Sequence, residues 1–200
     1  MGLLHGLLGR TSRSRLLSVA LGVLALVAGN ALSSHAAVVG FTGPYDISNW
    51  TFSNSNGTDG FLDTSNAPSS VLIASGNNGP IDNGANTDFS IVAPFSGSVG
   101  FDWSYSTTDG PFWDRFLVGV DGVFIQLTDN NGSQTQSGSY SISLLEGQLL
   151  TLRVFTVDAI LGRGETTISN FYAVPEPTSM AIFGLGTLGF AYRNRRKVLS

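Results

Sequence analysis

The sequence predicts an all-β protein built on a single antiparallel β-sandwich that is jelly-roll-like. Along Val99–Tyr105, apolar residues alternate with Gly, Asp and Ser, which is the period of a strand with one buried face. Further runs of this kind are separated by clusters of Gly, Asn, Asp and Ser, as in antiparallel sandwiches. Residues 37–173 contain no segment with the apolar period of an amphipathic helix, which leaves strands as the building elements.

Residues 1–36 have the composition of a secretory signal peptide. Three arginines precede an apolar core at residues 16–28, and Ser34 and Ala36 place small side chains at the −3 and −1 positions of a cleavage site. We therefore expect export and cleavage by a signal peptidase after Ala36. The alternative is an uncleaved N-terminal anchor, which the short apolar core and the small-residue site disfavour.

Strands are expected throughout the central domain, residues 37–173. Asp121-Gly122 lies between two alternating runs and predicts a hairpin, and Glu146-Gly147 is predicted to turn a second one. Trp50 and Trp103 are expected to lie in strands. In chain order the predicted strands cover residues 38–41, 47–53, 71–75, 88–93, 99–105, 116–120, 123–127, 140–144, 150–154 and 166–174.

The charge of the domain excludes one class of partner. Residues 37–177 hold three basic and fourteen acidic residues, a net charge of −11, whereas the whole chain carries −4. Such a surface repels phosphate backbones and has no basic stripe to attract them, so we expect no nucleic-acid binding. Metal cations and neutral sugars remain candidate partners.

The missing residue types exclude most catalytic chemistry. His5 and His35 lie in the signal peptide, Lys197 is the only lysine and lies near the C-terminus, and the chain has no cysteine. The domain therefore lacks the groups for a Ser-His-Asp triad, a thiol nucleophile, a Schiff base or an ordinary zinc site. We expect that the protein is not an enzyme, and we assign no catalytic residue.

One enzymatic alternative stays open, a glycan hydrolase that uses carboxylates alone. Its candidates are Glu146, at a predicted turn, and Glu165, at the start of the last strand. The competing interpretation is that both are solvated carboxylates of no catalytic role. Arg153 and Arg163 are expected to pair with Asp158 or Glu165, which would be structural.

Two aromatic residues form a candidate ligand site. Phe112 and Trp113 follow Gly110-Pro111 in a predicted loop and are flanked by Asp109 and Asp114. Exposed aromatic faces stack on the apolar faces of sugar rings, and neighbouring carboxylates bind hydroxyl groups. The site therefore suggests polysaccharide binding, and the alternative is that Trp113 folds back as a lid on the core.

Calcium is the candidate cofactor. Asp82, Asn83, Asn86 and Asp88 lie close together along the chain, and residues 129–132 form a second loop rich in oxygen ligands. Calcium takes six to eight such ligands from side chains and loop carbonyls. The alternative is that Asn, Asp and Gly are here as turn formers.

The C-terminal tail, residues 174–200, carries the most specific motif. Pro175, Glu176 and Pro177 precede an apolar segment at 178–192 and a basic cluster at 193–197. The cluster contains Arg193, Arg195, Arg196 and Lys197. The run Met180–Tyr192 spans only roughly 20 Å as a helix, against about 30 Å for the hydrocarbon core.

This order of elements resembles the PEP-CTERM sorting tail of exported bacterial proteins. The resemblance implies recognition and processing by an exosortase-type membrane protease, after transient anchoring in the inner membrane by a short hydrophobic helix. The basic cluster supports that orientation, because Lys and Arg beside an apolar segment are retained on the cytoplasmic side. The family is associated with bacteria that make extracellular polysaccharide, which implies delivery to the cell envelope or outside it.

These expectations combine into a non-catalytic envelope or extracellular-matrix protein that binds polysaccharide. A purely structural or adhesive surface protein without a small ligand is the alternative that remains beside the hydrolase.

Overall fold

The computed structural model describes residues 36–176, so the signal-peptide residues 1–35 and the tail from Pro177 onward lie outside the described residues. No helix within the described range is long and apolar enough to cross a bilayer. The elements are the strands β1 Val38–Val39, β2 Thr51–Asn54, β3 Phe61–Asp63, β4 Ser70–Ala74, β5 Ala85–Val92, β6 Gly97–Thr107, β7 Asp114–Val120, β8 Val123–Gln126, β9 Thr135–Leu144, β10 Leu149–Thr156 and β11 Gly164–Pro175, and the short 3-10 helices η1 Gly43–Tyr45 and η2 Ile47–Asn49.

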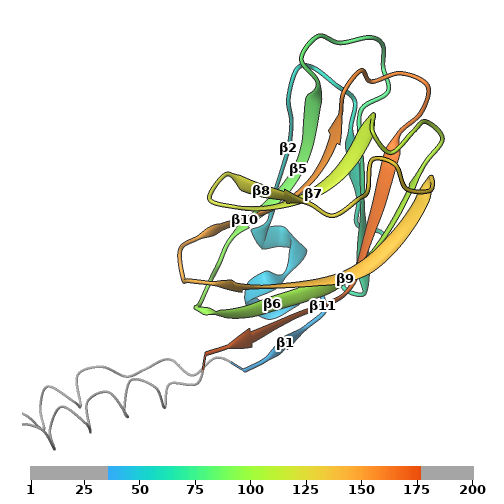
Figure 1. The fold of residues 1–200 in the computed structure, drawn as a ribbon. Coiled ribbons are helices and arrows are strands. Elements are labelled where there is room, and N and C mark those ends of the chain that lie inside the picture. The colour runs from blue at the N-terminus through green and yellow to red at the C-terminus, as the bar shows by residue number, and fades with distance from the viewer. Residues whose placement is uncertain (1–35, 177–200) are drawn as a thin grey trace, which may run out of the picture. The chain divides into compact units, whose positions relative to one another are not determined.

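The strands form two antiparallel sheets that lie face to face (Figure 1). Sheet A has the order β3-β4-β11-β6-β9, and β1 also pairs with β11. Sheet B has the order β2-β5-β10-β7-β8. This arrangement confirms the predicted all-β antiparallel sandwich.

The core fills the space between the sheets. Along β5 every second side chain is buried, as the alternating sequence predicts, and β10 buries Leu150, Leu152 and Val154 on its core face. Aromatic rings dominate one end, where Trp50 stacks on Phe89 with 4.5 Å between ring centroids and Phe41 stacks on Phe171 at 4.9 Å. Trp50 precedes β2 rather than lying within a strand.

The described residues contain a complete fold. Within the described residues, the buried apolar side chains of the core lie between Val38 and Ala173, and residues 36–176 belong to one compact unit. Since every strand of both sheets lies within residues 38–175, we expect a fragment of residues 37–176 to fold by itself.

The predicted hairpin at Asp121-Gly122 is confirmed, because β7 and β8 pair across it. Both turn residues have positive φ values, 50° and 82°, as a two-residue hairpin turn requires. The prediction of a hairpin at Glu146-Gly147 is wrong. There β9 pairs with β6 in sheet A and β10 pairs with β5 and β7 in sheet B, so the turn carries the chain from one sheet to the other.

Two local predictions also change. Residues 47–49 form a 3-10 helix before β2, because Asp46 accepts a hydrogen bond from the backbone N–H of Ser48 and caps the turn. The edge strand β3 was not predicted from the sequence, since a run of three residues between turn formers carries little periodic signal.

The last strand reaches into the C-terminal motif. Pro175 lies opposite Gly97 in the β11–β6 register, and the backbone N–H of Glu176 donates to the carbonyl oxygen of Ser96 at 2.9 Å. The first two residues of Pro-Glu-Pro are therefore attached to sheet A.

Candidate functional site

A groove with a volume of about 750 Å³ lies on the outer face of sheet B. Its residues come mainly from β2, β5, β8 and β10, whose side chains alternate between the core and this face. The lining residues are Pro44, Asn49, Thr51, Ser53, Asp88, Ser90, Ile91, Val92, Pro94, Gly122, Phe124, Leu149, Thr151 and Arg153.

An ion pair occupies one part of the groove. Asp88 and Arg153 are register partners on β5 and β10. Arg153 Nε donates to Asp88 Oδ1 and Arg153 Nη2 donates to Asp88 Oδ2, each at 2.7 Å. This two-point geometry fixes both side chains and cancels their charges. Nη1 of the guanidinium makes no hydrogen bond within the described residues, so that this donor and the remaining carboxylate lone pairs are available to a ligand.

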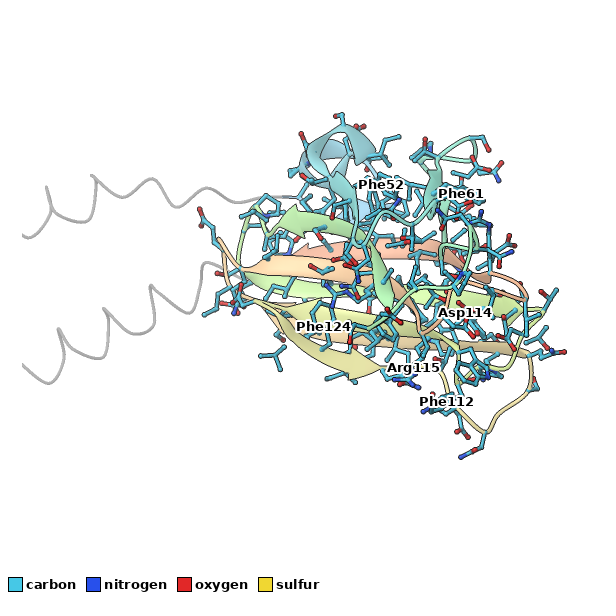
Figure 2. The ribbon with its side chains drawn as sticks, turned by 90° about the horizontal axis from the view of Figure 1, so that it is seen from above. Phe52, Phe61, Phe112, Asp114, Arg115 and Phe124 are labelled. Atoms are coloured by element: carbon cyan, nitrogen blue, oxygen red, sulfur yellow. The ribbon has the colours of Figure 1, made fainter. Side chains whose placement is uncertain are left out.

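The aromatic ring of Phe124 packs against the guanidinium group of Arg153. The centre of the Arg153 guanidinium lies 3.9 Å from the centroid of the Phe124 ring, a cation–π contact. The ring in turn lies over Gly119, where a Cβ atom would be only 2.5 Å from Phe124 Cε1. Glycine at 119 therefore makes room for the ring, and Figure 2 shows Phe124 on the β7–β8 side of the sheet.

Hydroxyl groups line the middle of the groove. Ser90 Oγ and Thr151 Oγ1 are 3.0 Å apart, and Thr51 lies opposite Ser90 on the other neighbouring strand. Thr151 lines the groove on the outer face of sheet B, yet its exposed fraction is only 5%. It therefore lies at the bottom of the groove, covered by the neighbouring lining residues. A hydroxyl both donates and accepts, and this row can bind a ligand with groups of either kind.

The opposite end of the groove is apolar. Val92 and Leu149 are register partners on β5 and β10, and they are 57% and 39% exposed. Pro44 and Pro94 line the same groove. Sheet B thus presents a graded surface, from an ion pair through hydroxyl groups to an apolar end.

The predicted aromatic residues lie beyond the polar end. Phe112 and Trp113 are 45% and 39% exposed, and their rings meet edge to face with centroids 5.2 Å apart. Arg115 links this loop to sheet B, because its guanidinium lies 4.7 Å from the Phe112 ring centroid and 5.7 Å from that of Phe155 on β10. Phe112 and Arg115 are labelled side by side in Figure 2. Neither aromatic residue lines the groove.

Asp114 does not belong to an exposed ligand set. It is 1% exposed and accepts hydrogen bonds from Ser75 Oγ at 2.8 Å and Thr107 Oγ1 at 3.2 Å. Burial raises the pKa of its carboxyl group, although these hydrogen bonds lower it in part. The sequence interpretation of Asp114 as a sugar ligand is corrected, since its side chain serves the fold.

Asp109 is also drawn into local structure. Its Oδ1 accepts from the backbone N–H of Gly110 at 2.7 Å, and its Oδ2 is buried with no hydrogen-bond partner among the described residues. Of the four predicted ligand residues, the structure leaves Phe112 and Trp113 as the accessible pair.

The predicted calcium ligands are spread over a turn and a strand. Asp82 and Asn83 precede β5, Asn83 has a positive φ of 68°, and Asn86 and Asp88 lie within β5. Asp88 is already bound to Arg153 through both oxygens. Residues 36–176 contain no group of three or more acidic or histidine side chains placed to hold a metal ion. Calcium binding stays a prediction.

The carboxylates of the hydrolase alternative lie outside the groove. Glu146 is exposed in the turn between β9 and β10, and Glu165 pairs with Ala74 and Ser106 in sheet A.

Comparison with known proteins assigns the tail. Residues 173–197 match the PEP-CTERM protein-sorting motif, which confirms the resemblance predicted from the sequence. The tail indicates an exported protein that is handled at the cell envelope. No curated protein matches the chain.

Solved structures resemble the sandwich at low sequence identity. A family 35 carbohydrate binding module from Clostridium thermocellum is 15% identical, with 71% of this chain and 100% of that chain covered and a TM-score of 0.35. The K1 cleaved adhesin domain of Lys-gingipain from Porphyromonas gingivalis W83 is 12% identical, with 72% and 100% covered and a TM-score of 0.42. TmCBM61, solved in complex with beta-1,4-galactotriose, is 19% identical, with 68% and 94% covered and a TM-score of 0.37.

Proposed function

We propose that this exported protein is a non-catalytic polysaccharide-binding protein of the envelope or extracellular matrix, and that the groove of sheet B is its binding site. The observation that carries the proposal is the Asp88–Arg153 pair beside the hydroxyl row of Ser90 and Thr151. The volume of about 750 Å³ falls within the range of small-ligand sites.

The chemistry of the groove suits a neutral sugar chain. Each sugar hydroxyl donates one hydrogen bond and accepts others, and the groove offers guanidinium donors, carboxylate acceptors and hydroxyl groups that do both. Because Asp88 and Arg153 neutralise each other, a neutral ligand meets no uncompensated charge. The net charge of −11 over residues 37–177 also disfavours polyanionic chains.

The predicted signal peptide and the C-terminal tail would together bring the domain to the cell envelope. A signal peptidase would release the body after Ala36, and an exosortase-type protease would process the tail after transient anchoring in the inner membrane. Delivery to the cell envelope would then place the groove where extracellular polysaccharide is found.

The test is calorimetric titration of fragment 37–176 with soluble neutral polysaccharides, in calcium and in chelator. We expect saturable binding that Arg153→Gln weakens about tenfold or more, because a charge-assisted donor is lost and Asp88 is left unpaired. The matched control is Asp102→Asn, since Asp102 lies on the outer face of sheet A and accepts from Ser139 and Asn170. No binding to any polymer would instead favour a structural or adhesive protein. Turnover of a reporter glycan would favour the hydrolase.

A further inference from the structure

If the groove binds polysaccharide, as proposed above, its apolar end indicates which kind of polysaccharide it prefers. Val92 and Leu149 lie side by side across β5 and β10, and Pro44 and Pro94 line the same groove. Both Val92 and Leu149 are large apolar residues with high exposure inside a concave site. Free sugar hydroxyls gain nothing from such a surface, because they must give up water there without a hydrogen-bond partner.

The apolar end is too far from the ion pair to contact the same ring. Asp88 and Val92 are four residues apart on β5, and a strand rises about 3.3 Å per residue, so their Cα atoms are roughly 13 Å apart. The hydroxyl row of Ser90 and Thr151 lies between them. A ligand that fills the groove therefore spans more than one sugar unit, with polar contacts at one end and apolar contacts at the other.

We infer that the groove selects a neutral polysaccharide that carries methyl-bearing substituents, either O-acetyl esters or 6-deoxy sugars, and that Val92 and Leu149 receive the methyl group. The methyl group fits the apolar end, while the ring hydroxyls of the neighbouring unit meet Asp88, Arg153 and the hydroxyl row. The neutral ion pair is consistent with both substituents, since neither adds a charge.

The experiment compares one polymer in two states. Fragment 37–176 is titrated with O-acetylated glucomannan and with the same sample after mild alkaline removal of the acetyl esters, which leaves the sugar backbone unchanged. A rhamnose- or fucose-rich neutral polymer is the third probe, because its methyl groups survive alkali. Burying one methyl group corresponds to about 0.8 kcal/mol, or about fourfold in affinity. We therefore expect at least fourfold tighter binding of a methyl-bearing probe than of the deacetylated polymer.

Two variants assign the effect to the apolar end. Leu149→Ser and Val92→Thr should each reduce the preference for the methyl-bearing probe to less than twofold. The control is Val39→Thr, because Val39 is 77% exposed on β1 of sheet A, outside the groove. A preference that alkali abolishes identifies O-acetyl groups, and a preference for the third probe alone identifies 6-deoxy sugars.

Two results would overturn the inference, and they are distinguishable. Equal binding of all three probes, unaffected by Leu149→Ser, would overturn the substituent selection and leave the proposed function standing. Binding of none of them, with capture of an apolar peptide that Leu149→Ser abolishes, would overturn both.

Discussion

Ionisation of Asp114 is opposed by its surroundings at the start of β7. Burial raises the pKa of its carboxyl group above its ordinary value of 3.8, while the hydroxyls of Ser75 and Thr107 lower it in part. The folded protein therefore holds this proton more tightly than the unfolded chain does. Its contribution to stability is fully present below the unfolded pKa and is lost as the pH rises through the folded pKa.

Asp114→Asn keeps the shape and one acceptor but does not ionise. The free energy of unfolding of the variant should rise relative to that of the native protein as the pH is raised above 3.8, because only the native protein loses stability as Asp114 ionises. Urea unfolding of fragment 37–176 at several pH values measures this difference. Asp114→Ala should cost about 1–3 kcal/mol, because Ser75 and Thr107 lose their acceptor. A difference between Asp114→Asn and the native protein that does not change with pH would contradict the account.

Gly119 offers a second test at the scale of single residues. Gly119→Ala places a Cβ atom against the Phe124 ring, which must move and release the Arg153 guanidinium. We expect groove binding to weaken about tenfold in calorimetric titration. Gly100→Ala is the control, because its Cβ would meet Tyr172 in the same way on sheet A, away from the groove. Equal effects of the two substitutions on binding would remove Phe124 from the site.

The ion pairs show why residue contacts were hard to predict. The sequence interpretation paired Arg153 and Arg163 with Asp158 or Glu165, which are close along the chain. The structure pairs Arg153 with Asp88 and Arg163 with Asp59. These partners come together only because strands and loops distant in sequence become neighbours, and alternation alone does not specify which strands do so.

At the scale of elements, the β7–β8 hairpin contributes to the stability of the fold and also lines part of the groove. Gly122 has a φ of 82° and lines the groove beside Phe124. Gly122→Ala should lower the free energy of unfolding by about 1 kcal/mol, because a side chain is strained at positive φ. Gly110→Ala is the matched control, since its φ is ordinary and its Cβ would make normal contact with Trp113 Cδ1 at 3.5 Å. Equal losses of stability in denaturant unfolding would show that the turn is unstrained.

Strand positions were largely predicted and strand pairing was not. Alternating runs located β6, β7, β10 and β11, because each buries one face. The alternating run of β8 was also located, although this edge strand has only exposed and half-buried side chains. The Asp121-Gly122 turn was interpreted correctly because its chemistry dictates a two-residue hairpin. At Glu146-Gly147 the turn residues indicate a chain reversal only, and the partner of each following strand is decided by the packing of the whole sandwich.

At the scale of the molecule, the candidate site depended on strand order. The sequence predicts Asp88 to be a calcium ligand and Arg153 to be part of a structural ion pair, and alternation alone does not bring the two together. Their shared groove follows from the order β2-β5-β10-β7-β8, which places distant polar positions in adjacent rows. The tail was predicted because its motif is continuous along the chain and needs no fold to be recognised.

The last prediction concerns processing of the tail. Pro175 and Glu176 are bound to β6 and Ser96, so a cut beyond Pro-Glu-Pro leaves both sheets complete. The intact mass of the protein isolated from its host should therefore lack residues 1–36 and the residues after the Pro-Glu-Pro region, and its unfolding curve should match that of fragment 37–176. Replacement of Arg193, Arg195 and Arg196 by Gln should block processing, because the proposed orientation in the membrane requires these charges on the cytoplasmic side. Recovery of the native protein with its full tail would make that segment an ordinary anchor.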